Sequence, residues 1–259
     1  AGFAWRDADL ALVDEARDLL AGAPRSYGHV VVDEAQDLTP MQLRMVARRA
    51  RRGSLTILGD IAQATGPFGY SSWADVLPHL PADAGVAIEE LRLAYRVPRE
   101  IMELATPLLP LVAADASPPV AYRSGGEPPR IVAVPEEELA ARAAAEAAAL
   151  RAREGTVGLI VPTALVDDAR AALDEAGLRA EASVAEELAP AVRLLTPRLA
   201  KGLEFDHVVV AEPAAIVEER GGVHGLRELY VSLTRPTKTL VVVHARALPA
   251  SLDVPPRTA

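Results

Sequence analysis

The stretch HVVVDEAQDLTPMQLRM, residues 29–45, contains a short apolar run that ends in a cluster of acidic side chains. Its three valines are β-branched and continuous, which is typical of a strand covered on both faces. Asp33 and Glu34 follow the valines at once, Asp37 comes three residues later, and Pro40 opens a helical pattern. Three carboxylates this close together repel one another. We therefore expect another group, such as a cation, to share their charge.

Similar apolar runs recur along the chain and predict the fold class. Seven runs read as buried strands, at residues 29–32, 55–58, 130–134, 157–161, 192–195, 207–211 and 239–243. Helical patterns separate most of them, at residues 11–20, 41–50, 99–109, 136–150 and 165–177. Alternation of strands and helices predicts an α/β fold with parallel sheets flanked by helices.

Composition limits the classes of function. The chain has 259 residues, a formal net charge of −9 and no cysteine, which excludes disulfides and thiolate metal sites. No apolar run approaches the roughly 20 residues of a membrane span, and the first residues do not resemble a signal peptide. We therefore expect a cytoplasmic protein with no membrane partner. Because nucleic-acid-binding domains are usually basic, so acidic a chain is expected to bind nucleic acid locally, weakly or not at all.

The polar clusters share one position, because each follows a predicted strand. Ligands of open parallel sheets bind beyond the carboxyl ends of the strands, so these clusters are expected to lie on the ligand edge of a sheet. They comprise Asp33 and Glu34 after the first run, Gly59, Asp60 and Gln63 after the second, and Thr196, Lys201, Gly202 and Glu204 after the fifth.

Asp33 and Glu34 fit a site that hydrolyses a phosphate anhydride. An aspartate can hold Mg²⁺, usually with several waters retained, and a neighbouring glutamate can polarise the attacking water. The alternative is that both acids only open the following helix. The amide of Gln63 can bond a phosphate and a water, whereas the alternative for Gly59-Asp60 is an ordinary Asx turn.

Two arginines lie where an element begins or ends. Arg96 comes just before a proline-initiated helix, and Arg235 ends a helix that leads into a strand. An arginine offered to a γ-phosphate accelerates hydrolysis by about 10³–10⁵-fold. The alternative is an arginine that caps a helix dipole. For Lys201-Gly202 the alternative is a hairpin-like turn between two strands.

Five segments together resemble a known family. DEAQD, GDIAQ, YR, KGLEFD and LYVSLTR occur in this order and resemble motifs II, III, IV, V and VI of superfamily 1 helicases of the UvrD/Rep type. The resemblance runs from about residue 27 to residue 243 and implies two RecA-like motor domains with ATP between them. Residues 1–84 would form the C-terminal part of motor domain 1, and residues 85–259 would form motor domain 2.

The resemblance also implies roles for individual residues. Asp33 would hold Mg²⁺ and Glu34 would activate water. The remaining residues would contact the nucleotide: Gln63, Arg96 and Arg235 at the γ-phosphate, Glu204 near the ribose, and Gly202 at a part of the nucleotide that is not specified.

The sequence departs from the family's pattern in four ways. It has no Walker A motif, and Lys201 and Lys238 are its only lysines, so we expect a truncated chain without the N-terminal half of the first motor domain. Tyr70 and Trp73 do not stand at the family's spacing for stacking on single-stranded bases. No large domain separates motifs IV and V, and Arg198 replaces the family's histidine.

These departures look most like the HelD-like proteins, in which the motor binds RNA polymerase and uses ATP to release it from nucleic acid. The leading hypothesis is therefore the motor portion of a HelD-like ATPase with RNA polymerase as partner. One alternative is an ATP-dependent DNA helicase or translocase of the UvrD/Rep type, with weak DNA binding by this segment. The other is a non-catalytic RecA-like interaction module.

Overall fold

The computed structural model describes residues 5–22, 25–50, 53–81, 85–178, 180–181 and 192–252. The chain divides into two compact units: unit 1 is Ala1–Glu90 with Ala113–Asp115, and unit 2 is Leu91–Val112 with Ala116–Ala259. The assignment of residues 1–84 and 85–259 to two motor domains stays a prediction. Residues 82–84, beside the expected boundary, lie outside the described ranges.

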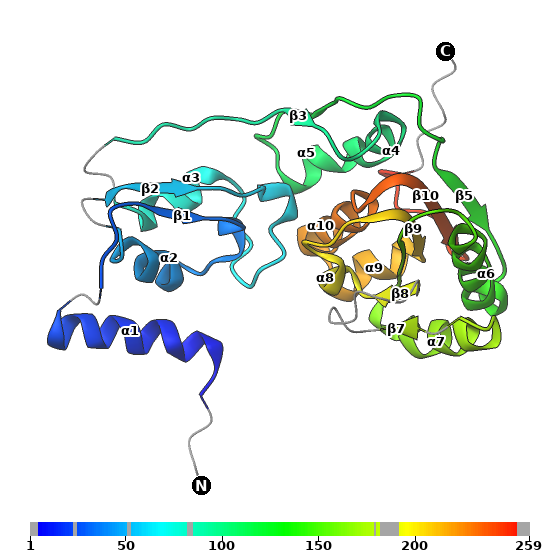
Figure 1. The fold of residues 1–259 in the computed structure, drawn as a ribbon, viewed down its shortest axis with the longest axis horizontal. Helices are drawn as coiled ribbons and strands as arrows, with labels where there is room; N and C mark the ends of the chain where they lie inside the picture. Colours follow the sequence, from blue (N-terminus) through cyan, green and yellow to red (C-terminus); the bar gives the residue numbers. More distant parts are fainter. Residues whose placement is uncertain are drawn as a thin grey trace, which may run out of the picture. The chain divides into compact units, whose positions relative to one another are not determined.

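Unit 1 contains a two-stranded parallel sheet with helices around it (Figure 1). Val30, Val31 and Val32 pair in register with Leu55, Thr56 and Ile57, so both strands end at the same edge. The elements of unit 1 are α1 (Asp7–Ala21), β1 (Val30–Val32), α2 (Pro40–Ala47), β2 (Leu55–Ile57) and α3 (Trp73–Val76).

Unit 2 is built on a six-stranded sheet in the order β5-β10-β9-β6-β8-β7, in which every pairing is parallel. The strands of this sheet are β5 (Arg130–Ala133), β6 (Val157–Ile160), β7 (Ala180–Glu181), β8 (Val192–Leu195), β9 (Phe205–Ala211) and β10 (Pro236–His244). Two further strands of unit 2, β3 (Leu93–Ala94) and β4 (Val120–Ala121), form a separate two-stranded sheet. Its helices are α4 (Arg99–Ala105), α5 (Leu109–Val112), α6 (Leu139–Arg151), α7 (Val166–Glu175), α8 (Pro197–Ala200), α9 (Pro213–Arg220) and α10 (Gly222–Leu233).

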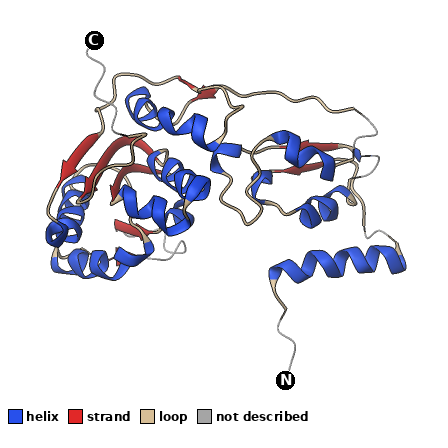
Figure 2. Ribbon diagram, turned by 180° about the vertical axis from the view of Figure 1, so that it is seen from behind, coloured by secondary structure: helices blue, strands red, loops and turns tan. Residues whose placement is uncertain are grey.

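Helices cover both faces of this sheet, which explains the continuous apolar runs within its central strands. Val209 of β9 packs with the buried side chains of α6 and α7, including Leu150 and Leu173. Its neighbours Val208 and Val210 are also fully buried. Because alternate side chains of a strand point to opposite faces, these two face the other layer, where Figures 1 and 2 show α8, α9 and α10.

The α/β class with parallel sheets flanked by helices is confirmed, and all seven predicted strands are present. Burial on both faces was wrong for β1, β2 and β5, in which Val31 is 62 % and Ile131 is 46 % exposed. Three further strands, β3, β4 and β7, were not predicted. Each has two residues, too few to form a hydrophobic pattern. The hairpin alternative for Lys201-Gly202 is wrong, because β8 and β9 both pair with β6. No helix in the described part of the chain is long and apolar enough to cross a membrane.

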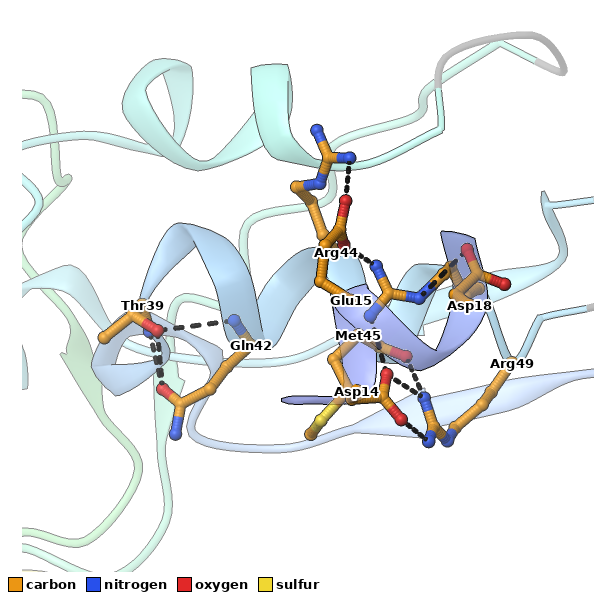
Figure 3. A network of polar contacts seen from close by, with 9 residues as sticks. Asp14, Glu15, Asp18, Thr39, Gln42, Arg44, Met45 and Arg49 are labelled. Carbon is orange, nitrogen blue, oxygen red and sulfur yellow. Dashed lines mark hydrogen bonds and ion pairs between the residues drawn. The ribbon is translucent and has the colours of Figure 1, made fainter. Parts of the chain in front are cut away.

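Ion pairs between charged side chains connect α1 with α2 and the residues just after it in unit 1 (Figure 3). Asp14 accepts hydrogen bonds from Arg48 Nη2 at 2.6 Å and from Arg49 Nη2 at 2.5 Å. Glu15 pairs with Arg44 at 2.6 Å and also with Arg48. The side chains of Asp14 and Arg48 are each only 13 % exposed, so solvent screens this pair less than a surface ion pair.

The arginines make this contact sensitive to acid. The hydrogen bond from Arg49 is the main cause that lowers the pKa of the Asp14 carboxyl, and Arg44 similarly lowers the pKa of Glu15. A carboxyl whose pKa is lower in the folded state than in the unfolded state stabilises the fold above its unfolded value, about 4 for aspartate. That stabilisation is lost as the pH falls from about 4 toward the folded value.

We predict that Asp14→Asn lowers the free energy of unfolding of unit 1 by about 1–3 kcal/mol at pH 7, because two arginines lose a charged acceptor. The difference from wild type should shrink below about pH 4, where the wild-type carboxyl also loses its advantage. Both tryptophans, Trp5 and Trp73, lie in unit 1, so urea titrations followed by tryptophan fluorescence report on it. Asp174→Asn, at an exposed position on α7, is the control. A difference that does not change with pH would contradict the ionic origin.

Candidate functional site

In unit 1 the predicted site residues lie at the carboxyl ends of β1 and β2. Asp33 and Glu34 follow β1, and Asp60 and Gln63 follow β2. Because the two strands are parallel and in register, both loops leave the sheet at the same edge. Asp33 and Glu34 are exposed there, and Gln63 is partly exposed.

The buried side chain of Gln36 joins the two loops. It is 0 % exposed, its Nε2 donates to Glu34 Oε2 at 2.5 Å, and its Oε1 accepts from the backbone N–H of Asp60 at 3.1 Å. A Cβ on Gly59 would stand 2.3 Å from Gln36 Oε1, so only glycine leaves room for this amide. Gln36 therefore sets both the position of the Glu34 carboxylate and the path of the second loop.

Asp37 makes a second connection between the same loops. Its Oδ1 accepts from the backbone N–H groups of Thr65 at 3.1 Å and Gly66 at 2.8 Å. Within the second loop, Gln63 Nε2 donates to Asp60 Oδ2 at 2.9 Å. The last residues of DEAQD thus hold the loop that carries Gln63.

Glu34 has a backbone conformation that favours glycine. Its φ is 54°, and among the described residues only Glu212 is another non-glycine with positive φ. Such a conformation costs on the order of 1–2 kcal/mol and is often found at functional sites. The hydrogen bond from Gln36 and the short 3-10 turn at residues 35–37 hold it in place.

The structure bears on the two alternatives for these loops. Thr39 caps α2 by accepting from the backbone of Gln42, so Asp33 and Glu34 do not cap that helix. Asp60 Oδ1 accepts from the N–H of Ala62 at 2.9 Å, so the Asx turn is present. This turn directs Gln63 back toward Asp60 and is compatible with a role for Gln63.

No group of three or more histidine, aspartate or glutamate side chains among the described residues could hold a metal ion by itself. Mg²⁺ commonly needs less from a protein, because one or two carboxylates suffice when waters and phosphates complete the octahedron. The exposed carboxylate of Asp33 fits this limited requirement.

In unit 2, Arg96 and Glu204 form an ion pair. Arg96 follows β3, whereas Glu204 directly precedes β9, so segments far apart in the sequence meet here. The side chains are 65 % and 39 % exposed. An ion pair this exposed is worth about 0–1 kcal/mol, so either partner can exchange it for a ligand at little cost.

Arg235 lies between α10 and β10 and is 5 % exposed. Its Nε donates to the carbonyl of Val231 at 3.0 Å and its Nη1 to the carbonyl of Leu203 at 3.3 Å. The second bond places Arg235 beside the segment of Lys201, Gly202 and Glu204. To contact a phosphate, the guanidinium would have to give up some of its hydrogen bonds to these carbonyls.

Gly202 turns the chain between α8 and β9. Its φ of 74° is in the left-handed region, and nothing lies within 4 Å of a Cβ built on it. Backbone conformation is therefore the constraint that favours glycine at this position, and it brings Leu203 and Glu204 to their partners.

A hollow of about 370 Å³ lies at the carboxyl ends of β6 and β8 in unit 2. Arg198, which stands where the family has histidine, lines it together with Thr163, Thr196, Pro197, Glu219, Arg220 and Glu228. Burial is the main cause that raises the pKa of the Glu228 carboxyl. None of these lining residues except Thr196 and Arg198 attracted notice in the sequence.

The predicted residues thus form two groups, one in each unit. Asp33, Glu34 and Gln63 gather in unit 1, while Arg96, Gly202, Glu204 and Arg235 gather in unit 2. Sequence reasoning gave no role to Gln36, which holds the first group together. Its place inside DEAQD was the available signal, but its partners include a backbone group 24 residues away.

Part of unit 1 matches a family model. Residues 7–68, less than half of the chain, match the UvrD/REP helicase N-terminal domain. The match spans β1 and β2 and includes Asp33, Glu34 and Gln63. No curated protein matches the chain.

Two solved structures are similar to parts of the chain. The C-terminal domain of a possible DNA helicase from Lactobacillus plantarum WCFS1 is 24 % identical, with 62 % of this chain and 92 % of that one aligned at a TM-score of 0.49. The arterivirus nonstructural protein 10 helicase, solved with DNA, is 17 % identical, with 85 % of this chain aligned at a TM-score of 0.44. The aligned region spans 40 % of the viral protein. At this level of similarity neither structure assigns an activity to the chain, whereas residues 7–68 are similar to the UvrD/REP helicase N-terminal domain.

Proposed function

We propose that the chain is the motor portion of a superfamily 1 ATPase, HelD-like in type, that couples ATP hydrolysis to remodelling or release of RNA polymerase. The observation that carries the ATPase part is the common edge of β1 and β2, where Asp33, Glu34 and Gln63 stand on two cross-linked loops. A carboxylate for Mg²⁺, a base and an amide at the ligand edge of a parallel sheet are the groups that phosphate-anhydride hydrolysis uses.

In this proposal Glu34 accepts a hydrogen bond from the attacking water and takes its proton. Gln36 supports this role because it donates to one carboxylate oxygen, Oε2, and so fixes the direction of the carboxylate. Gln63 contacts the γ-phosphate. Its position depends on Asp60, which in turn is held by Gln36.

Asp33 is proposed to hold Mg²⁺ through its exposed carboxylate. When bound, Mg²⁺ neutralises charge that develops on the phosphate oxygens. The backbone N–H of Glu34 donates to Asp33 Oδ1 at 2.8 Å, which restrains the carboxylate that would hold the ion.

Unit 2 is proposed to supply Arg96 and Arg235 to the γ-phosphate, Glu204 to the ribose, and Gly202 as a further nucleotide-binding residue. The exposed pair of Arg96 with Glu204 supports this role, since an incoming triphosphate can displace the carboxylate at little cost. Without a nucleotide, the guanidinium of Arg235 donates to backbone carbonyls, which orient it. A bound phosphate would replace some of these acceptors.

RNA polymerase as the partner rests on two observations of the sequence. The DEAQD and GDIAQ segments resemble the HelD-like proteins, and the net charge of −9 disfavours a polyanionic track. The second candidate is a DNA translocase of the UvrD/Rep type, which the match over residues 7–68 favours equally.

We predict that Glu34→Gln abolishes ATP turnover and preserves ATP binding, because the amide keeps the shape of the side chain and cannot take a proton. General-base catalysis contributes about 10²–10⁴-fold, which sets the expected loss of kcat. The measurement is phosphate release and nucleotide affinity in the natural protein that contains this chain. Glu175→Gln, at an exposed position on α7, is the matched control. Near-wild-type turnover in the Glu34 variant would show that the base is assigned wrongly.

The purified 259-residue chain should release phosphate from ATP at a negligible rate. It has no G-x-x-x-x-G-K-[ST] segment, so it lacks the backbone cradle and lysine that hold the β- and γ-phosphates. Phosphate release with and without Mg²⁺ measures this, with the Glu34→Gln chain as the blank. Robust Mg²⁺-dependent turnover by the chain would mean that triphosphate is held in another way.

The partner is tested by titrating labelled single-stranded DNA and bacterial RNA polymerase in parallel. We expect the chain to bind the oligonucleotide with a Kd of roughly 10⁻⁴ M at physiological salt, the weak end of non-specific binding. The natural protein that contains the chain should co-migrate with purified polymerase at far lower concentration. Tight DNA binding without a polymerase complex would instead support the DNA translocase, and binding to neither would support a non-catalytic module if ATPase activity were also absent.

A further inference from the structure

Unit 2 contains a tetrapeptide pattern twice, as LAYR at residues 93–96 and VAYR at residues 120–123. The two copies lie side by side, because β3 and β4 pair in parallel with Leu93 opposite Val120 and Ala94 opposite Ala121. The ladder continues where the N–H of Tyr122 donates to the carbonyl of Ala94 at 2.9 Å. The rings of Tyr95 and Tyr122 are accordingly neighbours, with centroids 5.3 Å apart.

The second arginine of this pair joins two parts of the candidate site. Arg123 Nη1 donates to the carbonyl of Arg96 at 3.2 Å and to the carbonyl of Thr237 at 3.0 Å. Thr237 lies in β10, two residues after Arg235. One nitrogen therefore ties the backbone that carries Arg96 to the strand that begins just after Arg235.

The loop that carries Arg123 is anchored independently of this side chain. The carbonyl of Arg123 accepts from the N–H of Arg99 at 2.9 Å, and the N–H of Gly125 donates to Glu100 Oε1 at 2.8 Å. A Cβ on Gly126 would stand 3.1 Å from Pro98 Cβ, so the loop lies closely against the start of α4. Loss of the guanidinium should consequently leave the loop in place and release only the tie between Arg96 and Thr237.

We propose that Arg123 is a positioning residue of the proposed ATPase site, which sets the Arg96 backbone relative to β10 so that Arg96 and Arg235 can act on the same phosphate. The inference rests on the proposed function. It follows from the reach of the arginines: the Arg96 side chain is long and 65 % exposed, so the placement of its backbone decides where its guanidinium can go. Displacement of a catalytic group by about 1 Å can cost on the order of 100-fold in rate.

The test is a double-mutant cycle on ATP hydrolysis by the natural protein that contains this chain, with Arg96→Ala, Arg123→Ala and both together. If Arg123 acts through Arg96, Arg123→Ala should lower kcat by about 10- to 100-fold with little change in KM, and should cost almost nothing further when Arg96 is already alanine. Arg123→Lys should restore most of the activity, because a single ammonium can replace the one nitrogen that makes both contacts. Arg153→Ala is the control, since Arg153 is another exposed arginine of unit 2 and pairs with Glu127 at the surface.

Hydrogen exchange separates failure of the proposal from failure of the proposed function. In Arg123→Ala, the backbone amides of residues 93–97 and 237–240 should exchange faster, while those of α6 keep the wild-type rate. The positioning role would be overturned if Arg123→Ala lowered kcat equally in the presence and absence of Arg96, or did not lower it at all. This holds even if hydrogen exchange shows that Arg123 holds the Arg96 and Thr237 backbones together. A wild-type protein without ATPase activity would refute the proposed function and the positioning role together, and unchanged exchange would refute the tie itself.

Discussion

Parallel pairing of strands is the constraint on which the candidate site depends. A parallel strand runs in the same direction as its neighbour, so the residues that follow two paired strands leave the sheet at one edge. In unit 1 this brings Asp33 and Glu34 to the edge where Asp60 and Gln63 emerge. In unit 2, helices bury both faces of the larger sheet. Polar groups are therefore found at the carboxyl ends of its strands, as they are in unit 1.

Buried or anchored polar groups then convert this proximity into fixed geometry. Gln36 lies fully buried between two loops and satisfies both its amide nitrogen and its carbonyl oxygen with them. An unsatisfied amide at that position would cost about 1–3 kcal/mol, so each loop depends on the presence of the other. Arg235 is held in a comparable way in unit 2, by carbonyls of its own helix and of the segment before β9.

Sequence reasoning succeeded where burial imposes a repeating pattern and failed where the decisive contact is a single long-range bond. The runs at residues 207–211 and 239–243 were recognisable because both faces of their strands are covered. The acidic and amide residues after β1 and β2 were recognisable because they directly follow short apolar runs, although those two strands are partly exposed. The contacts of Gln36, Arg123 and Arg235 with distant backbone groups could not be read from the sequence. Every residue has such backbone groups, so these contacts produce no pattern in the sequence of side chains.

The backbone of Glu34 carries a local cost in stability at the edge of the sheet. With φ at 54°, the position suits glycine better than any residue with a side chain, yet glutamate occupies it. A chain drifting under selection for folding only would be expected to lose the carboxylate here and gain stability by doing so. If Glu34 is the base proposed above, position 34 is a point where stability and activity trade against each other, and where natural variants could distinguish working motors from copies that have kept only the fold.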